Sequence, residues 1–72
     1  MSDDVRRTVV VLGVIPGDPP FRPVQAGGET LGVAYDMMDV IRLARQVGWK
    51  HVDLEDPAQV RWVGGGKYKW RV

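Results

Sequence analysis

The chain has 72 residues, a formal net charge of +1 and no cysteine. The length predicts one domain, residues 1–72, which buries only about 60% of the surface that its unfolded chain exposes. The missing cysteine excludes disulfides and cysteine-based zinc sites and fits a reducing, cytoplasmic location, while the near-neutral charge leaves electrostatic function to the distribution of charges.

A strand is expected over residues 8–15, after polar residues 1–5 that we expect to be frayed. Its sequence, TVVVLGVI, is apolar at nearly every position and rich in β-branched side chains, as is typical of a strand covered on both faces. Such a strand either lies in the middle of the sheet or presents its second face to another chain. The apolar run is too short for a membrane span and Gly13 interrupts it, so we expect neither a signal peptide nor a membrane helix.

Residues 16–33 are expected to form a connecting segment rich in proline and glycine. The four prolines of PGDPPFRP exclude helix and interior strand and predict an extended loop. Its Pro-x-x-Pro spacing is typical of segments that aromatic grooves bind, but it is also frequent by chance in proline-rich loops. Gly27 and Gly28 could turn a small hairpin, or the stretch could lead straight into a helix.

The helix prediction rests on an apolar stripe with a period of 3.6 residues, formed by Met37, Val40, Ile41, Ala44 and Val47. Asp36 would cap a short version of this helix and Thr30 a longer one. Gly48 is expected to end the helix in the left-handed conformation, with Trp49 packed back on the last turn.

A three-strand meander is expected after the helix, formed by WKHVDLED, VRWV and KYKWRV. The register that keeps the apolar residues on one face pairs Val63 with Lys67, Trp62 with Tyr68, Val60 with Trp70 and Leu54 with Val60, and sets Asp53 opposite Arg61. The predicted fold is therefore α+β: one helix packed on a mostly antiparallel sheet of three to five strands, in the order β-loop-α-β-β-β.

The outer face of this predicted meander collects cations. Arg61, Lys67, Lys69 and Arg71 are the candidate nucleic-acid contacts. Asp53 offsets part of their charge, and the aromatic residues face away from them, whereas single-strand binders stack bases on exposed aromatics. A solvated outer face therefore explains the pattern better than nucleic-acid binding does.

Catalytic and metal sites find little support in the sequence. His51, Asp53 and Glu55 alternate along one expected strand, but Asp53 is expected to pair with Arg61, and Gln59 is a poor fourth ligand. The stretch AGGETLG lacks the Lys-Ser/Thr pair of a phosphate-binding loop, and no nucleophile stands beside a base. We expect no enzyme activity, no metal, no cofactor and no small-molecule substrate.

Two functional hypotheses follow. The first is a small protein-interaction module, an accessory or inhibitory factor that binds another protein or forms a homodimer, because one helix cannot cover both faces of an apolar strand. Its candidate contacts are Val9, Val11, Ile15, Phe21 and Met38. The second is an accessory protein that binds nucleic acid through the basic face of the C-terminal hairpin.

Overall fold

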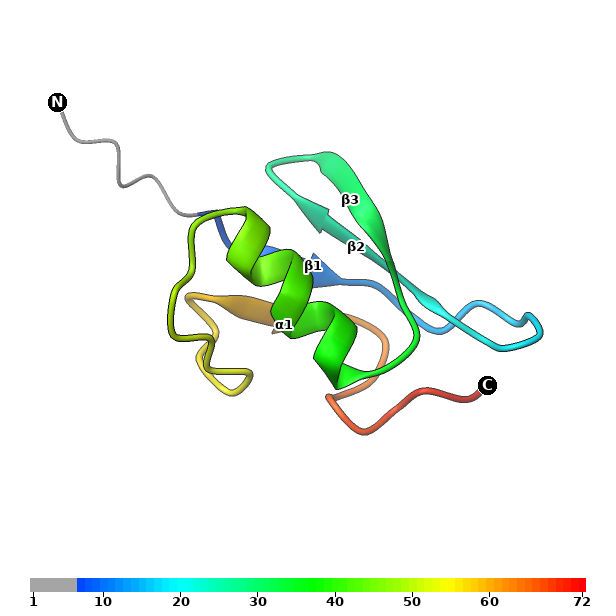
Figure 1. Cartoon of the computed structure of the whole chain (residues 1–72). Coiled ribbons are helices and arrows are strands. Elements are labelled where there is room, and N and C mark those ends of the chain that lie inside the picture. Colours follow the sequence, from blue (N-terminus) through cyan, green and yellow to red (C-terminus); the bar gives the residue numbers. More distant parts are fainter. Residues whose placement is uncertain (1–6) are drawn as a thin grey trace, which may run out of the picture.

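The computed structural model describes residues 7–72 and has one helix packed on a four-stranded sheet (Figure 1). The elements are β1 (Val9–Val11), β2 (Arg22–Ala26), β3 (Glu29–Ala34), α1 (Met37–Gln46) and β4 (Val60–Trp62). The strand order is β3-β2-β1-β4. The predicted α+β class is confirmed, although the sheet is mixed because β1 and β4 run parallel. The residues that were expected to fray, 1–5, lie outside the described part of the chain.

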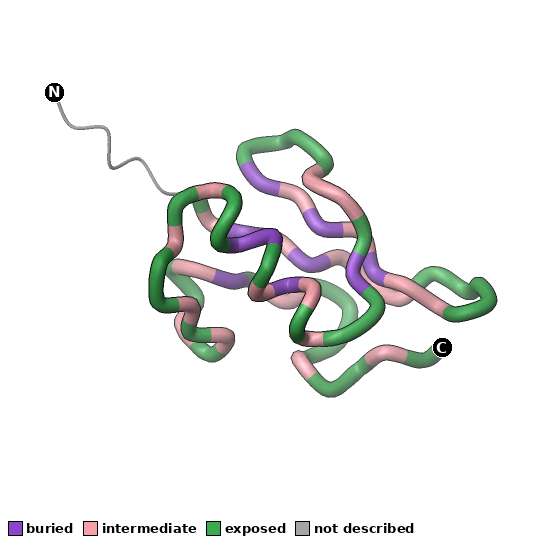
Figure 2. Tube along the Cα trace, in the orientation of Figure 1, coloured by how far each residue is buried: buried purple, intermediate pink, exposed green. Residues whose placement is uncertain are grey.

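β1 lies in the middle of the sheet, which is one of the two arrangements that its apolar sequence left open, and it is shorter than the expected strand 8–15. It pairs antiparallel with β2 and parallel with β4. Val9 and Val11 have no exposed surface and join the core cluster with Val40, Leu43 and Ala44 of α1 (Figure 2).

The segment 16–33 is more regular than the sequence predicted. It contains β2 and most of β3, joined in a hairpin by Gly27 and Gly28, whose φ angles are +59° and +82°. Glycine adopts such angles without the steric cost that a Cβ brings. Of the two paths that the sequence left open, the structure takes the hairpin.

Pro23 lies within interior strand β2, which the proline argument had excluded. Its carbonyl still accepts from the Leu12 N–H at 2.9 Å, at the point where β1 has ended. Its missing N–H leaves the Leu12 carbonyl free, and Arg22 Nε donates to that carbonyl at 2.7 Å. A side-chain donor thus replaces the backbone donor that proline lacks.

α1 follows its prediction closely in its shorter version. The Asp36 side chain caps it by accepting from the Asp39 N–H at 3.1 Å. At the other end, the N–H groups of Gly48 and Trp49 donate to Arg45 and Ala44. The buried face consists of Val40, Leu43 and Ala44, with Met37, Ile41 and Val47 partly buried. No helix among residues 7–72 is long and apolar enough to cross a membrane.

The predicted C-terminal meander is wrong. β4 pairs with β1, with Val60 opposite Val9 and Trp62 opposite Val11, and residues 50–59 and 63–72 contain no strand. A turn at Asp56, whose carbonyl accepts from Gln59 N and Val60 N at 2.9 Å each, leads the chain into β4. Of the three aromatic residues that were predicted on the apolar face, Trp62 and Trp70 pack against the core, whereas Tyr68 is 77% exposed.

Candidate protein-interaction site at the free edge of β4

The five predicted protein contacts do not form one surface. Val9 and Val11 are fully buried on the face of the sheet that α1 covers, so they belong to the core. Ile15 and Phe21 exchange two backbone hydrogen bonds, and the Phe21 ring packs edge-on against Tyr35. Met38 is 69% exposed on α1. Only three of the five residues therefore have surface that a partner can reach.

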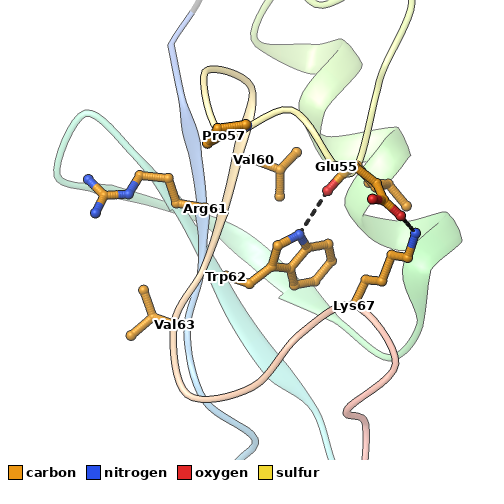
Figure 3. A pocket seen from close by; sticks show the side chains of 8 residues that line it. Glu55, Pro57, Val60, Arg61, Trp62, Val63 and Lys67 are labelled. Carbon is orange, nitrogen blue, oxygen red and sulfur yellow. Dashed lines mark hydrogen bonds and ion pairs between the residues drawn. The ribbon is translucent and has the colours of Figure 1, made fainter.

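The four predicted nucleic-acid contacts are not gathered by a hairpin, because that hairpin does not form. The side chains of Arg61 and Lys67 point to opposite sides of β4 (Figure 3). Lys67 forms an ion pair with Glu55, while Lys69 and Arg71 lie in the strandless C-terminal segment. Asp53 is in a loop and does not pair with Arg61.

The residues His51, Asp53 and Glu55 do not assemble into a metal site. Among residues 7–72, no group of three or more His, Cys, Asp or Glu side chains is placed to hold an ion. Asp53 Oδ1 accepts from the Glu55 N–H, and the Asp53 N–H donates to Gln59 Oε1. The side chains of Asp53 and Gln59 thus accept from backbone N–H groups of the loop that precedes β4.

A groove of about 510 Å³ follows β4 (Figure 3). Its apolar lining comes from Leu54, Pro57, Val60, Trp62 and Val63. Its charged lining comes from Glu55, Arg61 and Lys67. We call these eight residues the β4 groove.

The backbone of β4 turns one edge toward solvent. Gln59 O accepts from Val9 N at 2.7 Å and Val63 N donates to Val11 O at 2.8 Å, so these residues face β1. The alternation of a parallel ladder then directs the backbone groups of Val60 and Trp62 to the outer edge. The Val60 N–H donates to Asp56 O, whereas no described residue pairs with the N–H or carbonyl of Trp62. β4 is therefore an edge strand with a free donor and free acceptors.

The charges in the β4 groove are not equivalent. Lys67 Nζ donates to Glu55 Oε2, and this hydrogen bond lowers the pKa of Glu55 below its ordinary value of 4.5. The same bond raises the pKa of Lys67 above 10.5. Arg61 is exposed, and within residues 7–72 it has no carboxylate partner. The groove thus keeps one uncompensated cation.

One wall of the β4 groove is held by Arg22, which has no exposed surface. Its guanidinium donates five hydrogen bonds to backbone carbonyls: those of Leu12 (2.7 Å), Gly66 (2.7 Å), Lys69 (2.9 Å), Val63 (3.2 Å) and Gly65 (2.7 Å). These bonds use all five N–H groups of the side chain. Because four of the acceptors lie in residues 63–69, Arg22 fixes the segment that carries Val63 and Lys67.

Two tryptophans complete the surroundings of Arg22. The guanidinium carbon lies 5.3 Å from the Trp62 ring centroid and 5.4 Å from that of Trp70, within the range of cation–π attraction. The two indoles pack edge to face, and their N–H groups donate to the Leu54 and Lys67 carbonyls. Burial lowers the pKa of Arg22 from its ordinary value, but carbonyl oxygens and ring faces stabilise the charged form.

Sequence reasoning missed the role of Arg22, although a weak signal was present. Arg22 alternates in phase with Val24 and Ala26, which places it on the core face of β2. The glycines at 64–66 allow the chain to present several carbonyls to one cation, and Gly65 holds a φ of +132° there. The proline-rich context instead indicated a loop and concealed the strand.

A second hollow, of about 550 Å³, lies at the C-terminal end of α1 and is lined by Arg45, Gly48, Trp49, Lys50 and His51. Arg45 lies in the last turn of α1, where a basic side chain offsets the partial negative charge of the helix end.

Comparisons with protein-family models, with characterised proteins and with solved structures give no match, so the β4 groove has to be interpreted from its own geometry.

Proposed function

We propose that the chain is a small, non-enzymatic protein-interaction module that acts in the cytoplasm and binds an extended segment of another protein along β4. The observation that carries the proposal is the free edge at Trp62, whose backbone N–H and carbonyl point outward beside an apolar groove. An extended peptide that adds to such an edge gains main-chain hydrogen bonds, and adjacent apolar surface gives it side-chain contacts.

The size of the edge sets the expected strength of binding. Only the Val60 carbonyl and the two Trp62 groups are offered, because β4 spans Val60–Trp62. Apolar area buried in the groove adds about 25 cal/mol per Å² before the ordering costs of association. A short edge with one groove therefore supports a weak, transient complex.

Neither of the other partners considered from the sequence fits this site as well. Nucleic-acid binding needs cations on one surface, and Arg61 and Lys67 point to opposite sides of β4 (Figure 3). Antiparallel self-pairing of two β4 strands centred on Arg61 would set the two arginines against each other, and like charges directly opposed are destabilising. A segment of a different protein avoids both conflicts.

The test is selection of short random peptides displayed against the immobilised full chain, followed by NMR titration with an enriched peptide. We expect amide shift changes centred on Val60, Trp62 and Val63, with the Trp62 amide gaining protection from exchange. A K50E variant, altered in the second hollow, is the matched control and should bind equally. Failure to enrich any peptide, or shifts centred on the second hollow, would contradict the proposal.

A further inference from the structure

The side chains of the β4 groove indicate which residue types the bound segment has. This inference rests on the proposed function. We infer that the partner is an extended segment with an acidic residue between two apolar residues, and that Arg61 binds the acidic side chain. This apolar–acidic–apolar pattern rests on three observations: the alternation of side chains along β4, the charges of the groove, and the residues that the two edge strands β3 and β4 carry.

The alternation of side chains along β4 determines which residues of an added strand lie on each face of the sheet. Val60 and Trp62 face the side that α1 covers, and Arg61 faces the opposite side (Figure 3). Cross-strand neighbours share a face of the sheet and successive residues alternate. The partner residue opposite Arg61 therefore lies on the Arg61 side, and its two neighbours lie beside Val60 and Trp62.

The two sides of the added strand meet different chemistry. The helix side of the groove supplies the apolar surface of Leu54, Val60 and Trp62. On the opposite side, Arg61 offers an exposed guanidinium that no carboxylate among residues 7–72 engages. A guanidinium binds a carboxylate through two parallel hydrogen bonds, whereas a cation facing Arg61 would be repelled.

Glu55 does not compete for this role. Its carboxylate is held by Lys67, on the other side of β4 from Arg61. The ion pair also removes Lys67 as an alternative anchor for the partner's carboxylate. Arg61 is thus the cation of the groove that is free to select an acidic side chain.

A second copy of this chain does not offer the pattern on either of its edge strands. β4 itself carries arginine between its apolar residues, and the centre of β3 reads Leu31-Gly32-Val33. The acidic residue of β3, Glu29, follows Gly28, accepts a hydrogen bond from Arg7, and has no apolar neighbour on either side. The chain does carry the pattern in Val52-Asp53-Leu54, but there both apolar side chains pack against its own core and Asp53 accepts from the Glu55 N–H. The occupant is therefore a different protein.

Matched peptides test the inference on the unaltered chain. The probes are blocked peptides Thr-Val-Glu-Val-Thr, Thr-Val-Lys-Val-Thr and the phase-shifted Thr-Glu-Val-Glu-Thr, titrated by NMR at low salt. We expect the glutamate-centred peptide to bind about fivefold tighter than the lysine-centred one, which corresponds to about 1 kcal/mol for a cross-strand charge pair. The phase-shifted peptide should bind more weakly than the glutamate-centred one. In the same register its carboxylates lie on the apolar side, and sliding by one residue restores the contact with Arg61 but places a threonine where a valine would pack.

Reversing the charge of residue 61 gives a second test with the same peptides. R61E should reverse the preference between the glutamate- and lysine-centred peptides, while R45E, which changes an exposed arginine on α1, should leave it unchanged. Equal affinity for the two peptides, with Trp62 still protected in both complexes, would overturn the acidic pattern and leave strand addition standing. Absence of binding by all three peptides, and by any library peptide, would remove the proposed function and the inference together.

Discussion

Arg22 is a cation without exposed surface whose five N–H groups all donate to backbone carbonyls. A buried charge is costly unless every donor is satisfied, and here four carbonyls of the C-terminal segment and that of Leu12 do so. One side chain of β2 thereby takes the place of the strand pairing that residues 63–69 lack.

We expect R22M to destabilise the fold by about 3 kcal/mol, because the carbonyls around the guanidinium lose a charged donor. R22K, with three donors in place of five, should recover only part of that loss. Urea unfolding measures both values, and tryptophan fluorescence reports Trp62 and Trp70 directly. If R22M unfolds at the same urea concentration as the wild type, the five hydrogen bonds do not hold the segment.

Gly65 allows the chain to bend around Arg22. Its φ is +132°, and a Cβ there would lie 2.7 Å from Lys69 Cγ. G65A should therefore cost about 1–2 kcal/mol of unfolding free energy. G66A, where a Cβ meets nothing within 4 Å and φ is not positive, is the control and should change stability by much less. Equal losses in the two variants would contradict this role for Gly65.

The Glu55–Lys67 pair predicts a defined pH dependence. Because the pKa of Glu55 is lowered by its bond to Lys67, its contribution to stability is present above 4.5 and is lost as pH falls through the lowered value. The pKa of Lys67 is raised, so the contribution of Lys67 to stability is present below pH 10.5 and is lost as pH rises through the raised pKa. In K67M, an NMR titration of the Glu55 carboxyl should give a pKa that returns toward 4.5. An unchanged pKa would show that the pair does not form in solution.

At the scale of elements, the sequence predicted those whose signals are local. The apolar run predicted a strand at β1 but left open whether it is central. The apolar stripe predicted α1, with Gly48 at its end and its start left open between Asp36 and Thr30. Parallel pairing of β1 with β4 joins residues about fifty positions apart and leaves no local signature. The alternation of Val60, Arg61 and Trp62 is the same in a hairpin and in a parallel strand, so it could not distinguish them.

The candidate site was predictable only in part, because its residues are placed by contacts between distant parts of the sequence. The cations of the C-terminal stretch were recognised, but their placement depended on a hairpin that the Arg22 hydrogen bonds replace. The prediction of Val9 and Val11 as protein contacts is wrong because a strand that is apolar on both faces does not show which face the helix covers. The prolines predicted an extended loop, so neither β2 nor the buried Arg22 at its start was predicted.

The cap of α1 provides a prediction for a single element. The Asp36 side chain accepts from the Asp39 N–H, so D36A should cost about 1 kcal/mol, and D36N or D36S should retain most of the stability. Thermal unfolding followed by circular dichroism measures the order of the three variants. If D36A is as stable as the wild type, the helix does not depend on this cap.

At the scale of the whole molecule, one face of the sheet carries both α1 and the tryptophan-lined C-terminal segment. The sheet ends at β3 on one side and at β4 on the other, and the two edges differ. β3 contains Gly32, and its register against β2 shifts at Leu31, which has no partner between the pairs Val24–Gly32 and Gln25–Thr30. Both features disfavour regular pairing at this edge, whereas β4 lies beside the groove.

Since neither edge complements the other, we expect the chain to be a monomer in solution at both low and high salt. Light scattering at two salt concentrations measures the mass. A dimer that persists at high salt would indicate an apolar self-contact and would contradict the choice of a different protein as the partner. A dimer whose interface includes Trp62 would identify the second copy as the occupant of the edge.

The most direct test of the free edge is amide hydrogen exchange of the free chain, followed by NMR. Arg61 and Val63 face β1 through the parallel ladder, so their amides should exchange slowly, while the Trp62 amide between them should exchange much faster. Slow exchange at Trp62 in the monomer, equal to that of its neighbours, would mean that the edge of β4 is already paired and that no strand can be added there.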